Sequence, residues 1–122
     1  MVAAKAGQAR ANLAAAGLAA HVEVLEGDAR ETLRDLAGPI DLLLLDGWPQ
    51  LAIEVLRLVE PHLADGAVIV VDNVGQFAGD LKPVTERLGS APYRSALIPL
   101  RGGTLTAVYA ASSAPVAMTA VG

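Results

Sequence analysis

The stretch Ile40-Asp41-Leu42-Leu43-Leu44-Leu45-Asp46, followed by Gly47-Trp48-Pro49, decides the fold. Four consecutive leucines leave no polar face, which is typical of a parallel strand covered by helices on both sides. The Asp-Gly pair that follows has the chemistry of a turn, so Asp46 ends the strand. In open α/β sheets, ligands bind outside the carboxyl ends of the strands, and Asp46 is therefore a candidate site residue.

The same pattern recurs at residues 67–71 (Ala-Val-Ile-Val-Val), which are followed by Asp72 and Asn73. If the two strands are neighbours, about 4.8 Å apart, Asp46 and Asp72 converge on one edge of the sheet. Two such carboxylates repel each other unless a cation or a hydrogen-bond donor joins them. Asp46, Asp72 and Asn73 offer oxygen ligands, which suit a hard cation such as Mg²⁺ or Ca²⁺ and do not suit zinc. The spacing equally allows a reading in which Asp46 forms a turn and Asp72-Asn73 caps a loop.

Composition narrows the class of protein. A chain of 122 residues, 53% of them hydrophobic, predicts one domain over residues 1–110, followed by a disordered tail over residues 111–122. Thirteen acidic against nine basic residues, with no basic stripe, argue against a nucleic-acid partner. The absence of cysteine agrees with a reducing compartment. No apolar run approaches the roughly 20 residues of a membrane span, and no secretion signal is recognisable, so we expect no membrane partner and a cytoplasmic location.

Helical and strand patterns alternate along the chain. Helices are expected at residues 2–16, 29–36, 50–60 and 81–88, and strands at residues 22–25, 40–45, 67–71, 93–100 and 104–109. Such alternation implies a parallel sheet with right-handed crossovers. Gly102-Gly103 fits a hairpin turn between the last two strands, and Pro99 places the first of them at a sheet edge. Gly17 suits the end of the first helix, and Asp28 is expected either to cap the second helix or to bind a ligand.

Five short segments carry a family resemblance. They are Ala-Arg-Ala-Asn-Leu-Ala-Ala-Ala-Gly-Leu (9–18), Val-Glu-Val-Leu-Glu-Gly-Asp-Ala (22–29), Asp-Leu-Leu-Leu-Leu-Asp-Gly-Trp (41–48), Val-Val-Asp-Asn-Val (70–74) and Leu-Ile-Pro-Leu-Arg-Gly-Gly-Thr-Leu-Thr (97–106). In this order they resemble the class I S-adenosylmethionine-dependent O-methyltransferases, and most of all the metal-dependent catechol and caffeoyl-CoA type. The resemblance covers residues 3 to about 110. It implies an α/β, Rossmann-like three-layer sandwich with a mostly parallel sheet and a C-terminal antiparallel hairpin.

The resemblance also implies roles for residues. In that family, the acid before the Trp-containing turn and the Asp-Asn pair after the next strand hold a divalent metal, which implies Asp46, Asp72 and Asn73 as ligands. The Gly-Asp turn that contacts the cofactor adenine maps onto Gly27-Asp28-Ala29, and the Trp-containing turn maps onto Gly47-Trp48. The implied activity is methyl transfer from S-adenosylmethionine to a small hydroxylated molecule, assisted by Mg²⁺ or another divalent cation.

Two departures from the family pattern matter. Pro49 stands where the family has a lysine as general base, so the resemblance identifies no catalytic residue. The family's first strand, glycine-rich loop and ribose-binding acid lie upstream of the helix at which this sequence starts. We therefore expect a truncated domain lacking the N-terminal strands and the glycine-rich loop, with weak or absent cofactor binding. The missing strand would lie beside residues 40–45, and an open edge there predicts a homodimer or, as the alternative, a rearranged sheet in which residues 22–25 lie beside residues 40–45.

Two alternative functions stay open. The first is a non-catalytic remnant of the methyltransferase fold that acts through oligomerisation. The second is a phosphoacceptor receiver domain, which the Asp-Leu-Leu-Leu-Leu-Asp run, Pro49 and Lys82-Pro83 also resemble. Receivers need a helix and a strand before that lysine, and the nine residues between Asp72 and Lys82 leave no room for them.

Overall fold

The structure, a computed structural model, describes residues 3–111. It divides into two compact units, one ending at residue 37 and one beginning at residue 38, and each is described by itself. A single domain over residues 1–110 stays a prediction. Of the predicted tail, Ala111 is described and residues 112–122 lie outside the described residues. Within residues 3–111, no helix has the length and apolar character needed to cross a membrane.

The first unit begins with helix α1 (Ala3–Ala15), close to the predicted bounds. Its C-terminal end is closed by two hydrogen bonds: the Leu18 N–H donates to the Leu13 carbonyl (2.8 Å) and the Gly17 N–H donates to the Ala14 carbonyl (3.1 Å). Gly17 has a φ of 74°, which glycine adopts without steric cost. This is a Schellman ending, and it confirms the predicted role of Gly17.

The strand predicted at residues 22–25 is wrong. This segment belongs to no strand pair in the described part of the chain, and the side chains of Val22 and Leu25 are 45% and 37% exposed. The Arg10 guanidinium donates to the Val24 carbonyl (3.0 Å) and to the Glu26 carboxylate. A strand needs a neighbour that satisfies its backbone N–H and C=O groups, and an apolar alternation over four residues does not supply one.

Helix α2 (Ala29–Thr32) is shorter than the predicted span of 29–36. Beyond it, the Arg34 N–H donates to the Glu31 carbonyl (3.3 Å) and the Leu36 N–H donates to the Leu33 carbonyl (3.4 Å). These bonds reach back three residues, so the chain continues in tight turns and not in an α-helix.

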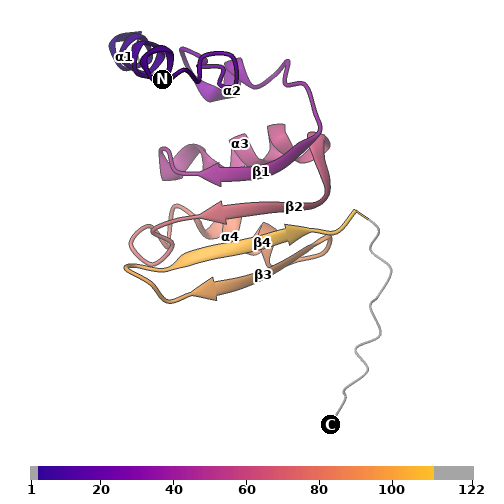
Figure 1. The fold of residues 1–122 in the computed structure, drawn as a ribbon. Coiled ribbons are helices and arrows are strands. Elements are labelled where there is room, and N and C mark those ends of the chain that lie inside the picture. The colour runs from indigo at the N-terminus through magenta and orange to yellow at the C-terminus, as the bar shows by residue number, and fades with distance from the viewer. Residues whose placement is uncertain (1–2, 112–122) are drawn as a thin grey trace. The chain divides into compact units, whose positions relative to one another are not determined.

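The second unit contains a four-stranded mixed sheet in the order β1-β2-β4-β3 (Figure 1). Its strands are β1 (Ile40–Leu45), β2 (Leu63–Val71), β3 (Tyr93–Ile98) and β4 (Thr104–Tyr109). Strand β1 is parallel to β2, whereas β2–β4 and β4–β3 are antiparallel. The C-terminal antiparallel hairpin and the edge position of β3 are therefore confirmed. The sheet is mixed and not mostly parallel, because β1–β2 is the one parallel pair among the described strands.

The crossover from β1 to β2 consists of helix α3 (Ala52–Val59) between two 3-10 turns, η1 (Pro49–Leu51) and η2 (Glu60–His62). Helix α4 (Lys82–Leu88) precedes β3 and holds Pro83 in its first turn, where the missing N–H costs nothing. In Figure 1 both helices lie behind the sheet. The largest fully buried side chains of this unit come from both helices and from the central strand β2: Leu56, Val84, Leu88, Ile69 and Val71.

Burial of β1 on both faces, which the leucine run predicted, is wrong. The side chains of Leu42 and Leu44 are 65% and 60% exposed, whereas Leu45 is buried. The alternation follows from the period of a strand, because successive side chains point to opposite faces. Four leucines make both faces of β1 apolar, and Leu42 and Leu44 lie on the face opposite to that of the buried Leu45.

Candidate metal and cofactor site

The carboxyl ends of β1 and β2 bring three polar side chains to one pocket. Leu45 lies opposite Val71 in the parallel register, so Asp46 and Asp72 leave the sheet at the same edge. Asp46, Asp72 and Asn73 all line this pocket, whose empty space of about 290 Å³ is partly open to solvent. The convergence expected from the sequence is therefore observed, and the role of these side chains as ligands stays a prediction.

The rest of the pocket is mainly apolar. Its other lining residues are Leu45, Gly47, Pro49, Ala52, Phe77 and Leu81. Trp48 is 76% exposed and does not belong to the lining. The two aspartates are the titratable side chains of the lining, so the pocket holds acid and amide oxygens against an apolar wall.

The Asp72 carboxylate is held by donors from two elements. Its Oδ1 atom accepts from the Asn73 N–H (2.9 Å) and from the Thr104 hydroxyl (3.0 Å). Thr104 reaches Asp72 because Val71 pairs with Leu105 in the antiparallel register of β2 and β4. Within residues 3–111, neither Asp72 Oδ2 nor the Asp46 carboxylate takes part in a hydrogen bond or ion pair.

The loop after β2 is tied to the hairpin turn before β4. The Val74 N–H donates to the Gly103 carbonyl (3.0 Å) and the Gly75 N–H donates to the Gly102 carbonyl (2.6 Å). A Cβ atom at Gly75 would lie 2.7 Å from the Gly102 oxygen, so this approach requires glycine. Asn73 has a φ of 57°, in the left-handed region that asparagine tolerates better than most residues. These contacts hold the backbone of the loop that carries Asn73 in place after β2.

The donor set fits a small divalent cation. Mg²⁺ is usually bound through one or two carboxylates and keeps several waters, so two carboxylates and one amide oxygen suffice for a site of this kind. Within residues 3–111, no cluster of three or more His, Cys, Asp or Glu side chains is placed to hold a metal ion. The candidate site therefore depends on the Asn73 amide as its third ligand.

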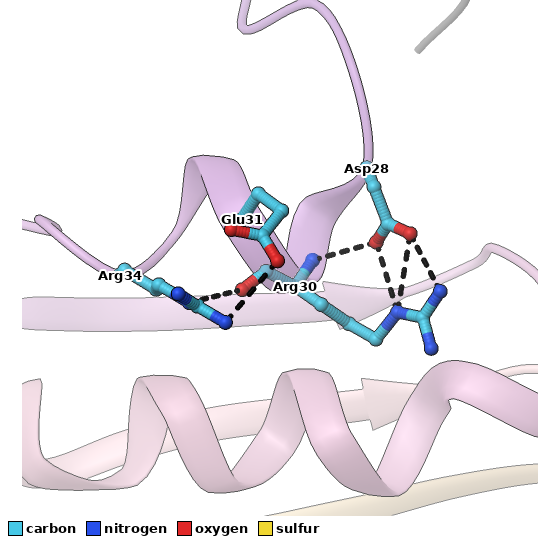
Figure 2. Close-up of polar contacts among 4 residues, drawn as sticks. All are labelled: Asp28, Arg30, Glu31 and Arg34. Carbon is cyan, nitrogen blue, oxygen red and sulfur yellow. Dashed lines mark hydrogen bonds and ion pairs between the residues drawn. The ribbon is translucent and has the colours of Figure 1, made fainter.

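Asp28 caps helix α2, which was one of the two roles predicted for it. Its side chain accepts from the Arg30 N–H (2.9 Å) and also from the Arg30 guanidinium, whose Nε lies 3.1 Å from both carboxylate oxygens and whose Nη2 lies 2.7 Å from Oδ2 (Figure 2). The guanidinium bonds, followed by the backbone N–H, lower the pKa of Asp28 to about 2. Its predicted contact with the cofactor stays a prediction.

The other predicted cofactor residues fall in both units. Gly27, with a φ of 109°, and Ala29, the first residue of α2, flank Asp28 in the unit that ends at residue 37. Gly47 and Trp48 belong to the unit that begins at residue 38.

Two residues that hold candidate side chains, one in each unit, carry no motif. Arg30 could be suspected from its spacing, because a basic residue two positions after an N-cap acid can reach that acid. Thr104 is 32 residues away from Asp72, and only the pairing register of β2 with β4 would have placed the two side chains together.

A mixed α/β sheet with a pocket at the carboxyl ends of its parallel strands is typical of the class of Rossmann-like α/β proteins. Within that class, residues 2–74 match the family model described as a methyltransferase domain, and the chain belongs to this family. The membership inferred from the five segments is confirmed.

Known proteins agree with this assignment. Catechol O-methyltransferase of Mycobacterium tuberculosis (strain ATCC 25618 / H37Rv) is 43% identical over 74 residues, which are 60% of this chain and 34% of that protein. The structure of the O-methyltransferase TomG from Streptomyces achromogenes, involved in tomaymycin synthesis and in complex with SAM, matches with a TM-score of 0.76 and 25% identity, over 86% of this chain and 57% of that chain.

The O-methyltransferase from Bacillus cereus, in complex with SAH, shares the fold with a TM-score of 0.77 at 20% identity, over 89% of this chain and 60% of that chain. The predicted Rossmann-like methyltransferase fold is confirmed. The chain spans about a third of the length of the curated relative and less than two thirds of these structures.

Proposed function

We propose that this protein transfers a methyl group from S-adenosylmethionine to an oxygen atom of a small hydroxylated molecule, with the help of a divalent cation. Membership of the methyltransferase-domain family and similarity to a catechol O-methyltransferase support the reaction. The complex of TomG with SAM supports the cofactor.

The observation that carries the proposal is the meeting of Asp46, Asp72 and Asn73 in one pocket at adjacent strand ends. These three side chains would hold Mg²⁺ or a related cation. A bound divalent cation would polarise an acceptor hydroxyl and stabilise the oxyanion that attacks the methyl group. Pro49 offers no proton acceptor, and we assign no catalytic base.

For the cofactor we propose contacts from Gly27, Asp28 and Ala29 and from Gly47 and Trp48. The Asp28 carboxylate already receives four hydrogen bonds from Arg30, which is about the number of lone-pair sites that a carboxylate offers. An adenine amino group would therefore have to compete with the Arg30 guanidinium for Asp28.

The test is formation of S-adenosylhomocysteine from S-adenosylmethionine and a panel of catechols and hydroxylated aromatics. Because weak cofactor binding is expected of this chain by itself, we expect at most slow turnover, measured at high S-adenosylmethionine and millimolar Mg²⁺, and we expect it to be lost in chelator and in Asp72→Ala. Asp41→Ala is the matched control, because Asp41 is an exposed aspartate on the same strand as the pocket residue Leu45. Turnover that survives chelation would overturn the role of the cation. Absence of product with every acceptor would overturn the enzymatic proposal.

A second candidate is a non-catalytic protein that assembles through the sheet. The observation that favours it is the position of β1 at the edge of the sheet, with Leu42 and Leu44 exposed. An edge strand presents unpaired N–H and C=O groups that can pair with a strand of another chain. A stable oligomer without turnover would favour this function.

A further inference from the structure

We propose that Thr104 is a positioning residue for Asp72, which restricts that carboxylate to a single metal-binding oxygen, Oδ2. The inference rests on the proposed cation site and goes beyond it, because it names a residue outside the pocket lining and the coordination mode that it imposes. Two observations carry it: the hydrogen bonds on Asp72 Oδ1, and the rigidity of the elements that make them.

The first observation is a count of lone pairs. A carboxylate has about two lone-pair sites on each oxygen. On Asp72 Oδ1 both sites are used, one by the Asn73 N–H at 2.9 Å and one by the Thr104 hydroxyl at 3.0 Å. Oδ2 accepts no hydrogen bond from any described residue. A cation that approaches Asp72 therefore meets one available oxygen.

The second observation is that both donors are fixed. The Asn73 N–H is part of a backbone held by the bond from the Gly75 N–H to the Gly102 carbonyl. Thr104 is the first residue of β4, and Leu105 beside it pairs with Val71, the residue before Asp72. One donor on β4 and one in the loop tied to the hairpin turn leave the carboxylate little freedom to rotate about its terminal torsion.

A single available oxygen has a consequence for cation preference. Ca²⁺ takes six to eight oxygens and often binds a carboxylate through both of them, whereas Mg²⁺ takes six in a compact octahedron. Mn²⁺ shares the preference of Mg²⁺ for oxygen ligands and serves as its probe. Removal of the Thr104 hydroxyl frees one lone pair on Oδ1, which loosens the carboxylate and permits binding through both oxygens. The site should then lose affinity for Mn²⁺ and gain relative preference for Ca²⁺.

The experiment is a calorimetric titration of the full chain with Mn²⁺ and, separately, with Ca²⁺. Thr104→Val preserves the shape of the side chain and removes the hydroxyl donor, whereas Thr104→Ser keeps this donor. Thr106→Val is the matched control, because Thr106 lies on the same strand and makes no side-chain hydrogen bond to a described residue. Partners that orient metal ligands typically contribute 10- to 100-fold in affinity, so we expect Mn²⁺ binding about 10-fold weaker in Thr104→Val.

We expect wild-type affinity in Thr104→Ser and Thr106→Val, and a Ca²⁺-to-Mn²⁺ affinity ratio that rises only in Thr104→Val. Equal Mn²⁺ affinity in wild type and Thr104→Val, together with lost binding in Asp72→Asn, would overturn the role of Thr104 and leave the cation site standing. No Mn²⁺ binding by the wild type would overturn both. If Thr104→Val does not fold, as circular dichroism would show, Thr104→Ala carries the same test.

Discussion

Arg30 makes Asp28 an unusually strong acid for an exposed residue. The guanidinium covers both carboxylate oxygens while the Arg30 N–H caps the helix through Oδ1 (Figure 2). Both interactions favour the charged form, which is why the pKa of Asp28 falls to about 2 from its ordinary value of 3.8. The charged form of the cap is therefore retained at neutral pH.

We predict that the side-chain carboxyl carbon of Asp28 titrates near pH 2 by NMR, and that Arg30→Gln moves this pKa up toward 3.8. Because the folded pKa is depressed, the contribution of Asp28 to stability is present above the unfolded pKa and is lost as the pH falls from about 4 to about 2. Glu31→Gln is the control, since Glu31 pairs with Arg34 and not with Asp28. An unchanged Asp28 titration in Arg30→Gln would contradict the assigned cause.

At the residue scale, the sequence predicted where the polar side chains that directly follow the strands would lie. Asp46, Asp72 and Asn73 follow apolar runs, and strands that are parallel neighbours carry such residues to one edge. The cap at Asp28 was predictable from the turn before a helical pattern. Thr104 was not, because its partner depends on which strand pairs with β2 and in what register, and neither is encoded in a local pattern.

At the scale of elements, helix α1 and its C-terminal end contain two glycines with opposite expected effects. Gly7 lies inside the helix with open space where a Cβ atom would lie, so Gly7→Ala should stabilise the helix by about 0.5 to 1 kcal/mol. Gly17 has a φ of 74°, where a Cβ atom is strained, and Gly17→Ala should destabilise the helix by about 1 to 2 kcal/mol. Far-UV circular dichroism during urea unfolding measures both. Changes of the same sign in the two variants would contradict the Schellman ending.

The elements that the sequence predicted well have strong local signals. Helix α4, the glycine-rich hairpin turn and the parallel pairing of β1 with β2 followed from proline, glycine and periodicity. The failure at residues 22–25 has a non-local cause, since a strand exists only when a partner is hydrogen-bonded to it. The exposure of Leu42 and Leu44 also has a non-local cause. The hydrophobicity of a side chain does not specify which other residues pack against it.

At the scale of the whole molecule, the edge position of β1 predicts self-association. We expect a dimer by light scattering after size exclusion at micromolar concentration, and a monomer for Leu42→Lys, since charge on an edge strand disfavours pairing. Leu42 is 65% exposed, so this substitution leaves the core intact. Leu100→Lys, at a residue 64% exposed outside the strands, is the control and should remain a dimer. A monomeric wild type would rule out the dimer.

The central claim is that Asp46, Asp72 and Asn73 hold a divalent cation in a chain of the methyltransferase-domain family, and the direct measurement is thermal melting in cation against chelator. A cation that binds only the folded state adds about 2.7 kcal/mol to stability at 100 times its dissociation constant. We predict that millimolar Mg²⁺ or Mn²⁺ raises the melting temperature of the wild type and leaves that of Asp72→Ala unchanged. Identical melting of the wild type in cation and in chelator, matched by Asp72→Ala, would contradict the claim.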